Sequence, residues 1–75
     1  MIELDLRRLL CPMPVIKVQN AMNKLSAGTQ LRAVCTDPGA LHDIPTWCRI
    51  NGHLVLSTAQ AQNEITFILQ AGNNL

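Results

Sequence analysis

The sequence predicts a two-layer α/β sandwich, in which two helices cover one face of a four-stranded mixed sheet. Three observations predict this fold class. Hydrophobic periodicity changes along the chain in the order strand, helix, strand, helix, strand, strand. The first crossover is expected to be right-handed, which allows both helices to lie on one face of the sheet. The length of 75 residues, of which 48% are hydrophobic and 15% charged, suits one small domain over residues 1–75.

The first strand and the first helix are predicted from different periodicities. Apolar and acidic residues alternate over residues 2–6, which is typical of a strand. A loop over residues 7–10 then leads to Cys11. Apolar residues recur after it at spacings of three and four, namely Val15, Val18, Met22 and Leu25. This pattern predicts a helix that stops near Ala27, because Gly28 can adopt the left-handed conformation of a helix cap.

A second strand and a second helix follow. Residues 31–36 are typical of a mostly buried strand. Asp37 and Pro38 indicate a helix start, with an acceptor side chain at the cap and proline just inside the helix. Pro45 cannot donate a helical hydrogen bond, so we expect a kink or a restart capped by Asp43. Both aspartates are therefore interpreted as caps, and no catalytic pair of carboxylates is evident.

The end of the chain predicts a hairpin. Asn51 and Gly52 should close the second helix. Residues 53–58 and 64–70 are typical of strands, and the polar segment 59–63 joins them. Polar residues are expected to cover the sheet face that lies away from the helices: Glu3, Asp5, Arg32, Glu64 and Thr66.

Charge and composition argue against several classes of function. Six basic and five acidic residues give a formal charge of +1, and the chain has one Trp, one Phe and no Tyr. Direct nucleic-acid binding is therefore not expected. No apolar run approaches the roughly 20 residues that span a bilayer, and the first residues lack an apolar signal core. We expect no membrane association and a cytoplasmic location.

The stretch Cys11-Pro12-Met13-Pro14 lies where the loop enters the first helix. Pro12 disfavours helical backbone for the residue before it and suits the first helical position, so Cys11 is expected to cap the helix. Pro14 has no amide hydrogen, which leaves the amide of Met13 to face the sulfur. Together with the helix dipole, this amide predicts a lowered pKa for the thiol and a reactive thiolate.

The three cysteines allow other interpretations. Cys11 could be a small residue at a turn that its prolines fix, although a reactive thiol is favoured. A dithiol mechanism is disfavoured, because no second cysteine has the required spacing. Cys35, His42, Cys48 and His53 are zinc-ligand types, but their spacing argues against zinc, and no metal or cofactor is expected. We expect buried structural thiols at the two later cysteines and surface or helix-end positions for the histidines.

The chain resembles the TusA/SirA-like sulfur carrier proteins, whose mark is a Cys-Pro-x-Pro motif at the start of the first helix. The likeness runs from about residue 3 to residue 70 and includes Leu4-Asp5, Asp37-Pro38, Asp43-Ile44-Pro45 and Trp47-Cys48. It implies the fold predicted above, and it implies that Cys11 is the catalytic residue. Family members accept sulfane sulfur on this cysteine as a persulfide, from a cysteine desulfurase or another sulfur-donor protein. They then pass it to a downstream acceptor protein.

The resemblance leaves the destination of the sulfur open between tRNA thiolation, cofactor assembly and sulfur oxidation. The alternative function is a non-catalytic protein-interaction or regulatory module of the same fold. The family usually has glycine before the motif where this chain has Arg8, which leaves the shape of the loop open. Arg8 could stabilise a thiolate, although a solvated side chain is the preferred interpretation. The sulfur of a carrier must enter the active sites of two different partners, so the residues around Cys11 should contact them. The expected partner surface consists of Arg8, Met13 and Lys17 beside the motif prolines Pro12 and Pro14.

Overall fold

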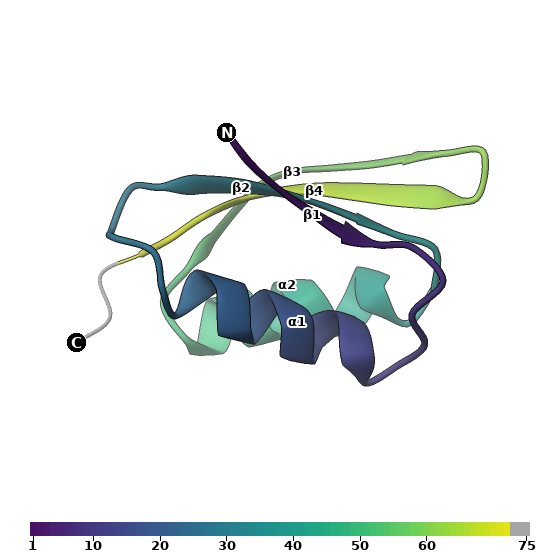
Figure 1. The fold of residues 1–75 in the computed structure, drawn as a ribbon, viewed down its shortest axis with the longest axis horizontal. Helices are drawn as coiled ribbons and strands as arrows, with labels where there is room; N and C mark the ends of the chain where they lie inside the picture. The colour runs from purple at the N-terminus through teal and green to yellow at the C-terminus, as the bar shows by residue number, and fades with distance from the viewer. Residues whose placement is uncertain (73–75) are drawn as a thin grey trace.

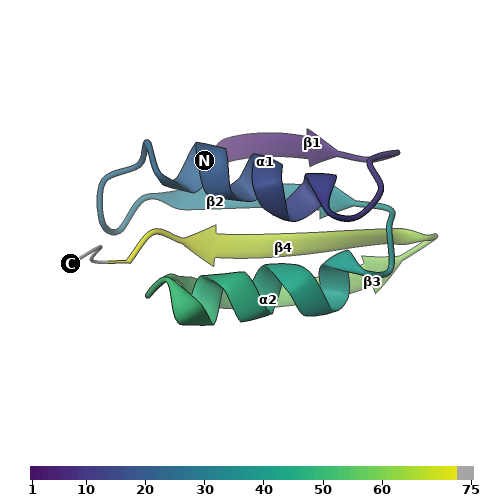
Figure 2. The same ribbon diagram turned by 90° about the horizontal axis from the view of Figure 1, so that it is seen from below.

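A computed structural model describes residues 1–72 of the protein. The elements follow the predicted order: β1 (Ile2–Leu6), α1 (Met13–Met22), β2 (Gln30–Cys35), α2 (Ala40–Ile50), β3 (Leu54–Ala61) and β4 (Glu64–Gln70). Both helices lie on the same face of the sheet (Figure 1). Seen from the helical side, α1 runs along β1 and β2, and α2 runs along β4 and β3 (Figure 2). The predicted two-layer α/β sandwich is confirmed.

The sheet is mixed and has the strand order β1-β2-β4-β3. β1 and β2 are parallel, as a crossover through α1 requires, and β4 is antiparallel to both of its neighbours. Alternate residues of each strand point to opposite faces, so one set from β2 and β4 meets the helices. The largest fully buried side chains are Phe67, Leu6, Met22, Leu31, Ile44, Leu69, Val18, Cys35 and Cys48.

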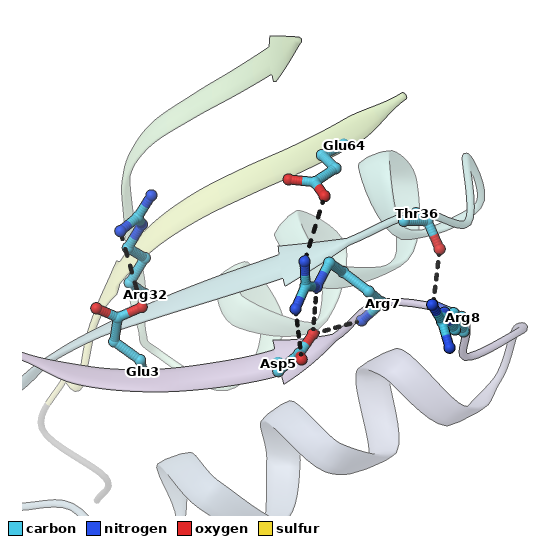
Figure 3. Close-up of polar contacts among 7 residues, drawn as sticks. All are labelled: Glu3, Asp5, Arg7, Arg8, Arg32, Thr36 and Glu64. Atoms are coloured by element: carbon cyan, nitrogen blue, oxygen red, sulfur yellow. Dashed lines mark hydrogen bonds and ion pairs between the residues drawn. The ribbon is translucent and has the colours of Figure 1, made fainter. Parts of the chain in front are cut away.

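The opposite face of the sheet carries charged residues that pair across strands (Figure 3). Arg7 Nε lies 2.9 Å from Asp5 Oδ1, and Arg7 Nη1 lies 3.6 Å from Glu64 Oε2. Arg32 Nη1 lies 3.7 Å from Glu3 Oε1 on the neighbouring strand. Hydrogen bonds from Arg7 lower the pKa of Asp5 to about 2. Exposed pairs of this kind contribute little stability, so their main effect is to keep the face solvated.

α1 differs from the prediction at its end, and for α2 the structure excludes one of the two predicted outcomes at Pro45. α1 ends at Met22 rather than near Ala27, and the next residues form tight turns in which Leu25 N–H donates to the carbonyl of Met22. Gly28 has the expected positive φ of 90°, but its N–H donates to Ala71 O, so it serves the turn into β2. α2 continues through Pro45, and the restart does not form. Core contacts on both sides of the proline hold α2 together.

The end of α2 has the hydrogen bonds of a Schellman motif. His53 N–H donates to Cys48 O at 2.8 Å, Gly52 N–H donates to Arg49 O at 3.4 Å, and Gly52 has φ 78°. The predicted closure at Asn51 and Gly52 is therefore confirmed. This motif turns the residue after glycine back against the helix, which explains the environment of His53 described below.

The hairpin is tighter than predicted. β3 extends to Ala61, and the connection consists of Gln62 and Asn63, with φ values of 52° and 67°. Two successive residues with positive φ are typical of a type I′ turn, whose twist suits a hairpin. Residues 59–61, expected in the loop, instead form the end of an exposed edge strand.

The topology brings four element ends to one end of the molecule. The carboxyl ends of β1 and β2 and the amino ends of α1 and α2 all lie there (Figure 2). The loop that carries Cys11 and the loop before α2 therefore start from neighbouring strands. Among residues 1–72, neither helix has the length and hydropathy needed to cross a membrane.

Candidate functional site at Cys11

The loop between β1 and α1 is held by hydrogen bonds that its backbone amides donate. Leu9 N–H donates to Leu6 O at 3.3 Å, and Arg8 N–H donates to Thr36 Oγ1 at 2.8 Å (Figure 3). Arg8 has φ 71°, in the left-handed region that glycine adopts without steric cost. The arginine thus occupies a glycine-like conformation, and the loop is anchored to the residue that follows β2.

The start of α1 corrects the predicted cap. Pro12, with φ −94° and ψ 10°, takes the cap position, and within residues 1–72 no side chain caps this helix. Met13 N–H donates to Leu10 O at 2.9 Å and does not face the sulfur of Cys11. The amide of Met13 is therefore already hydrogen-bonded within a turn of the loop and is not available to the sulfur. Pro14 is buried in the first turn of the helix, where its lack of an amide hydrogen costs no helical bond.

Two carboxylates from outside α1 meet Cys11 instead. Cys11 N–H donates to Asp37 Oδ2 at 2.7 Å, and the Cys11 thiol donates to Asp43 Oδ2 at 3.1 Å. Asp37 also accepts the amide of Gly39 at 3.3 Å, but Gly39 is the cap residue of α2. Asp43 lies in the first turn of α2. Both aspartates therefore hold the loop of Cys11 rather than cap a helix, and the sequence analysis missed this pair of carboxylates.

The pKa of Cys11 is raised, which overturns the predicted thiolate. The largest cause is the hydrogen bond to Asp43, followed by desolvation and by the negative charges of Asp43 and Asp37. A full charge at hydrogen-bonding distance outweighs the partial charge of a helix end. Within the described residues Arg8 makes no contribution to this pKa, so the structure gives it no role in stabilising a thiolate. The contacts of Cys11 therefore favour the neutral thiol over the thiolate.

The other two cysteines are part of the core, as predicted. Cys35 and Cys48 have no exposed surface, and burial raises the pKa of each thiol to about 11. Cys11 is exposed. All three positions lie within residues 1–72, so Cys11 is the one cysteine that a partner or reagent can reach in the folded protein.

The histidines lie in different environments. His42 is exposed, as expected. His53 follows the end of α2 as predicted, but it is 5% exposed, its Nδ1 accepts the amide of Gly72 at 3.0 Å, and its ring stacks on Trp47. Burial lowers its pKa. In the part of the chain that the structure describes, no three His, Cys, Asp or Glu side chains are grouped so that they could hold a metal ion.

Exposed apolar side chains lie next to Cys11 in the loop and in the first turn of α1. Leu10 is 73% exposed, and Met13 and Ile16 are each 39% exposed. Lys17 is also exposed on α1. The expected partner-surface residues Arg8, Met13 and Lys17 are thus accessible, while Pro14 is buried.

Fold and site together define a class of small α/β protein that presents one accessible cysteine at the start of its first helix. The chain belongs to the TusA sulfurtransferase family, which it matches over residues 2–71. Its general function is therefore sulfur transfer.

Similar proteins include YrkI of Bacillus subtilis, which is 36% identical over 69 residues, covering 92% of each chain. The sulfur carrier protein TusA of Allochromatium vinosum is 26% identical over 68 residues, which cover 91% of this chain and 90% of that one. The crystal structure of a SirA-like protein from Desulfitobacterium hafniense has a TM-score of 0.84 at 21% identity. It covers 97% of this chain and 100% of that chain, and it supports the fold.

Proposed function

We propose that this protein is a sulfur carrier that accepts sulfane sulfur as a persulfide on Cys11 and relays it to an acceptor protein. The observation that carries the proposal is that Cys11 is exposed whereas Cys35 and Cys48 are fully buried. A carrier needs a thiol that two different proteins can reach in turn. The name of the Allochromatium relative as a sulfur carrier supports the same role.

The proposed transfer needs no cofactor on this chain. Cys11 sulfur attacks the outer sulfur of a persulfide on the donor, which is a cysteine desulfurase or another sulfur-donor protein. The sulfur–sulfur bond of the donor breaks while a new one forms at Cys11, and the donor cysteine leaves as a thiol. The proposed destination is tRNA thiolation or another sulfur-transfer route, through a downstream acceptor protein. We propose the cytoplasm as the location, and neither direct nucleic-acid binding nor membrane binding is part of this role.

Sulfur loading tests the proposal. Reduced protein is incubated with a cysteine desulfurase and free cysteine, and its intact mass is then measured. We expect the mass of one added sulfur, located on Cys11, in the wild type and in the control variant Cys48→Ala. Cys11→Ser should take up no sulfur and keep its fold, because a hydroxyl can still donate to Asp43 but is a far weaker nucleophile. Equal loading of Cys11→Ser would overturn the assignment of Cys11 as the carrier residue. No loading of the wild type would favour the interaction-module alternative.

A further inference from the structure

The contact between Cys11 and Asp43 joins α2 to the sulfur itself. The thiol donates to Asp43 Oδ2 over 3.1 Å, between residues that are 32 positions apart in the sequence. A thiolate has no proton to donate, and it would face the carboxylate as a like charge. The contact therefore stabilises the neutral thiol and opposes the anion.

A second contact keeps the sulfur at this carboxylate. Asp37 accepts the backbone N–H of Cys11 at 2.7 Å, and its other carboxylate oxygen accepts the amide of Gly39. The loop of Cys11 is thereby fixed to the segment that leads into α2. The charged groups that act on the sulfur are Asp43 of α2 and Asp37 of that segment, both negative. Within residues 1–72 no cationic side chain offsets them.

We propose that Asp43 is a positioning residue that holds Cys11 as a neutral thiol in the resting carrier, and that a cationic side chain of the donor protein releases the thiolate by pairing with this carboxylate. The inference deepens the proposed function and rests on it. It assigns a chemistry to the donor, which should present a lysine or arginine beside its persulfide. Asp43 is only partly buried, so such a side chain can reach it.

The step needs no oxidant or reductant. When the donor cation pairs with Asp43, Cys11 gives up its proton and its sulfur attacks the outer sulfur of the donor persulfide. The donor sulfur–sulfur bond breaks, and the donor cysteine takes up the proton that Cys11 released. One sulfane sulfur has then moved between two cysteines, with no net change in charge or oxidation state.

The rate of alkylation by iodoacetamide, measured across pH, tests the first half of the proposal without any partner. Cys35 and Cys48 are buried, so the reagent reports on Cys11, and peptide mass analysis checks the site. Asp43→Asn keeps an acceptor oxygen but removes the charge. We expect its pH profile to move to lower pH and its rate at neutral pH to rise about tenfold, because the thiolate is the reactive species. A purely structural role would leave the profile in place.

Three variants serve as controls. Asp43→Glu keeps the charge and should react as slowly as the wild type. Glu3→Gln removes one charge from the far face of the sheet and should change nothing. Asp37→Asn loses a charge that acts on the sulfur only from a distance, so its effect should be smaller than that of Asp43→Asn. If Asp43→Asn follows the wild-type profile while it is folded by circular dichroism, the proposal is wrong.

Loading from a cysteine desulfurase tests the second half. If a donor cation pairs with Asp43, wild-type loading should slow as ionic strength rises, and Asp43→Asn should lose part of that salt dependence. Equal salt dependence in both proteins would overturn the role assigned to the donor cation. A wild type that takes up no sulfur would instead overturn the proposed function, and the alkylation profile would still decide whether Asp43 controls Cys11.

Discussion

Arg8 carries a backbone conformation that its side chain does not favour. A non-glycine residue in the left-handed region costs about 1 to 2 kcal/mol, and Arg8 has φ 71°. Its N–H is held by Thr36 Oγ1, so the loop keeps this shape despite the cost. At the residue scale, the hydrogen bond to Thr36 therefore maintains the shape of the loop despite the backbone strain at Arg8.

Arg8→Gly should stabilise the protein. Relief of the left-handed strain exceeds the extra backbone entropy that glycine loses on folding, and the net gain should be about 0.5 to 1 kcal/mol. Urea unfolding followed by circular dichroism measures it. Arg8→Ala removes the guanidinium but keeps the strain, so its free energy of unfolding should stay within about 0.5 kcal/mol of the wild type. Equal stability of the glycine and alanine variants would show that Arg8 is not strained.

At the scale of elements, α2 performs two tasks with different residues. The residues of α2 that face the sheet are buried, namely Ala40, Ile44 and Cys48. They keep this position although Pro45 has no N–H for a helical hydrogen bond. Asp43 points instead to the loop before α1. The core face of α2 therefore sets the position of the carboxylate that meets the sulfur.

Cys48→Ser should lower the free energy of unfolding by about 1 to 3 kcal/mol, because a hydroxyl in an apolar site loses its hydration. Cys48→Ala is the matched variant, since it also removes the sulfur but adds no polar group, and it should cost less. Thermal or urea unfolding of the two variants measures the difference. Serine as stable as alanine, or loss of sulfur loading in either folded variant, would show that the role of this thiol is misassigned.

At the scale of the whole molecule, the two helices beside the Cys11 loop carry exposed or half-buried side chains of opposite charge. The formal charge is only +1, so any electrostatic guidance of a partner must come from local groups. Asp43 lies on the α2 side of Cys11, and Lys17 lies on α1, less than one turn beyond the motif. A donor protein with complementary charge would present a basic side chain opposite Asp43 and an acidic side chain opposite Lys17.

Lys17→Glu should slow sulfur loading from the donor about fivefold at low salt, because reversed charge hinders encounter more than it weakens the complex. The alkylation rate of Cys11 should change little. Lys24→Glu makes the same charge change beyond the far end of α1 and serves as the control. Loading rates measured across ionic strength test the idea, and equal rates for wild type and Lys17→Glu at low salt would exclude this lysine from guidance.

The sequence alone determined the order of the elements, the hairpin, the closure of α2 at Gly52 and the position of Cys11 before the first helix. These features depend on neighbouring residues, because periodicity and turn chemistry are local along the chain. Tertiary structure decided the chemistry of the sulfur. Cys11 meets partners 26 and 32 positions away only because β1 and β2 pair in parallel and α2 packs beside α1. Local reasoning saw the dipole of one helix end, whereas the folded protein adds two full negative charges that outweigh it.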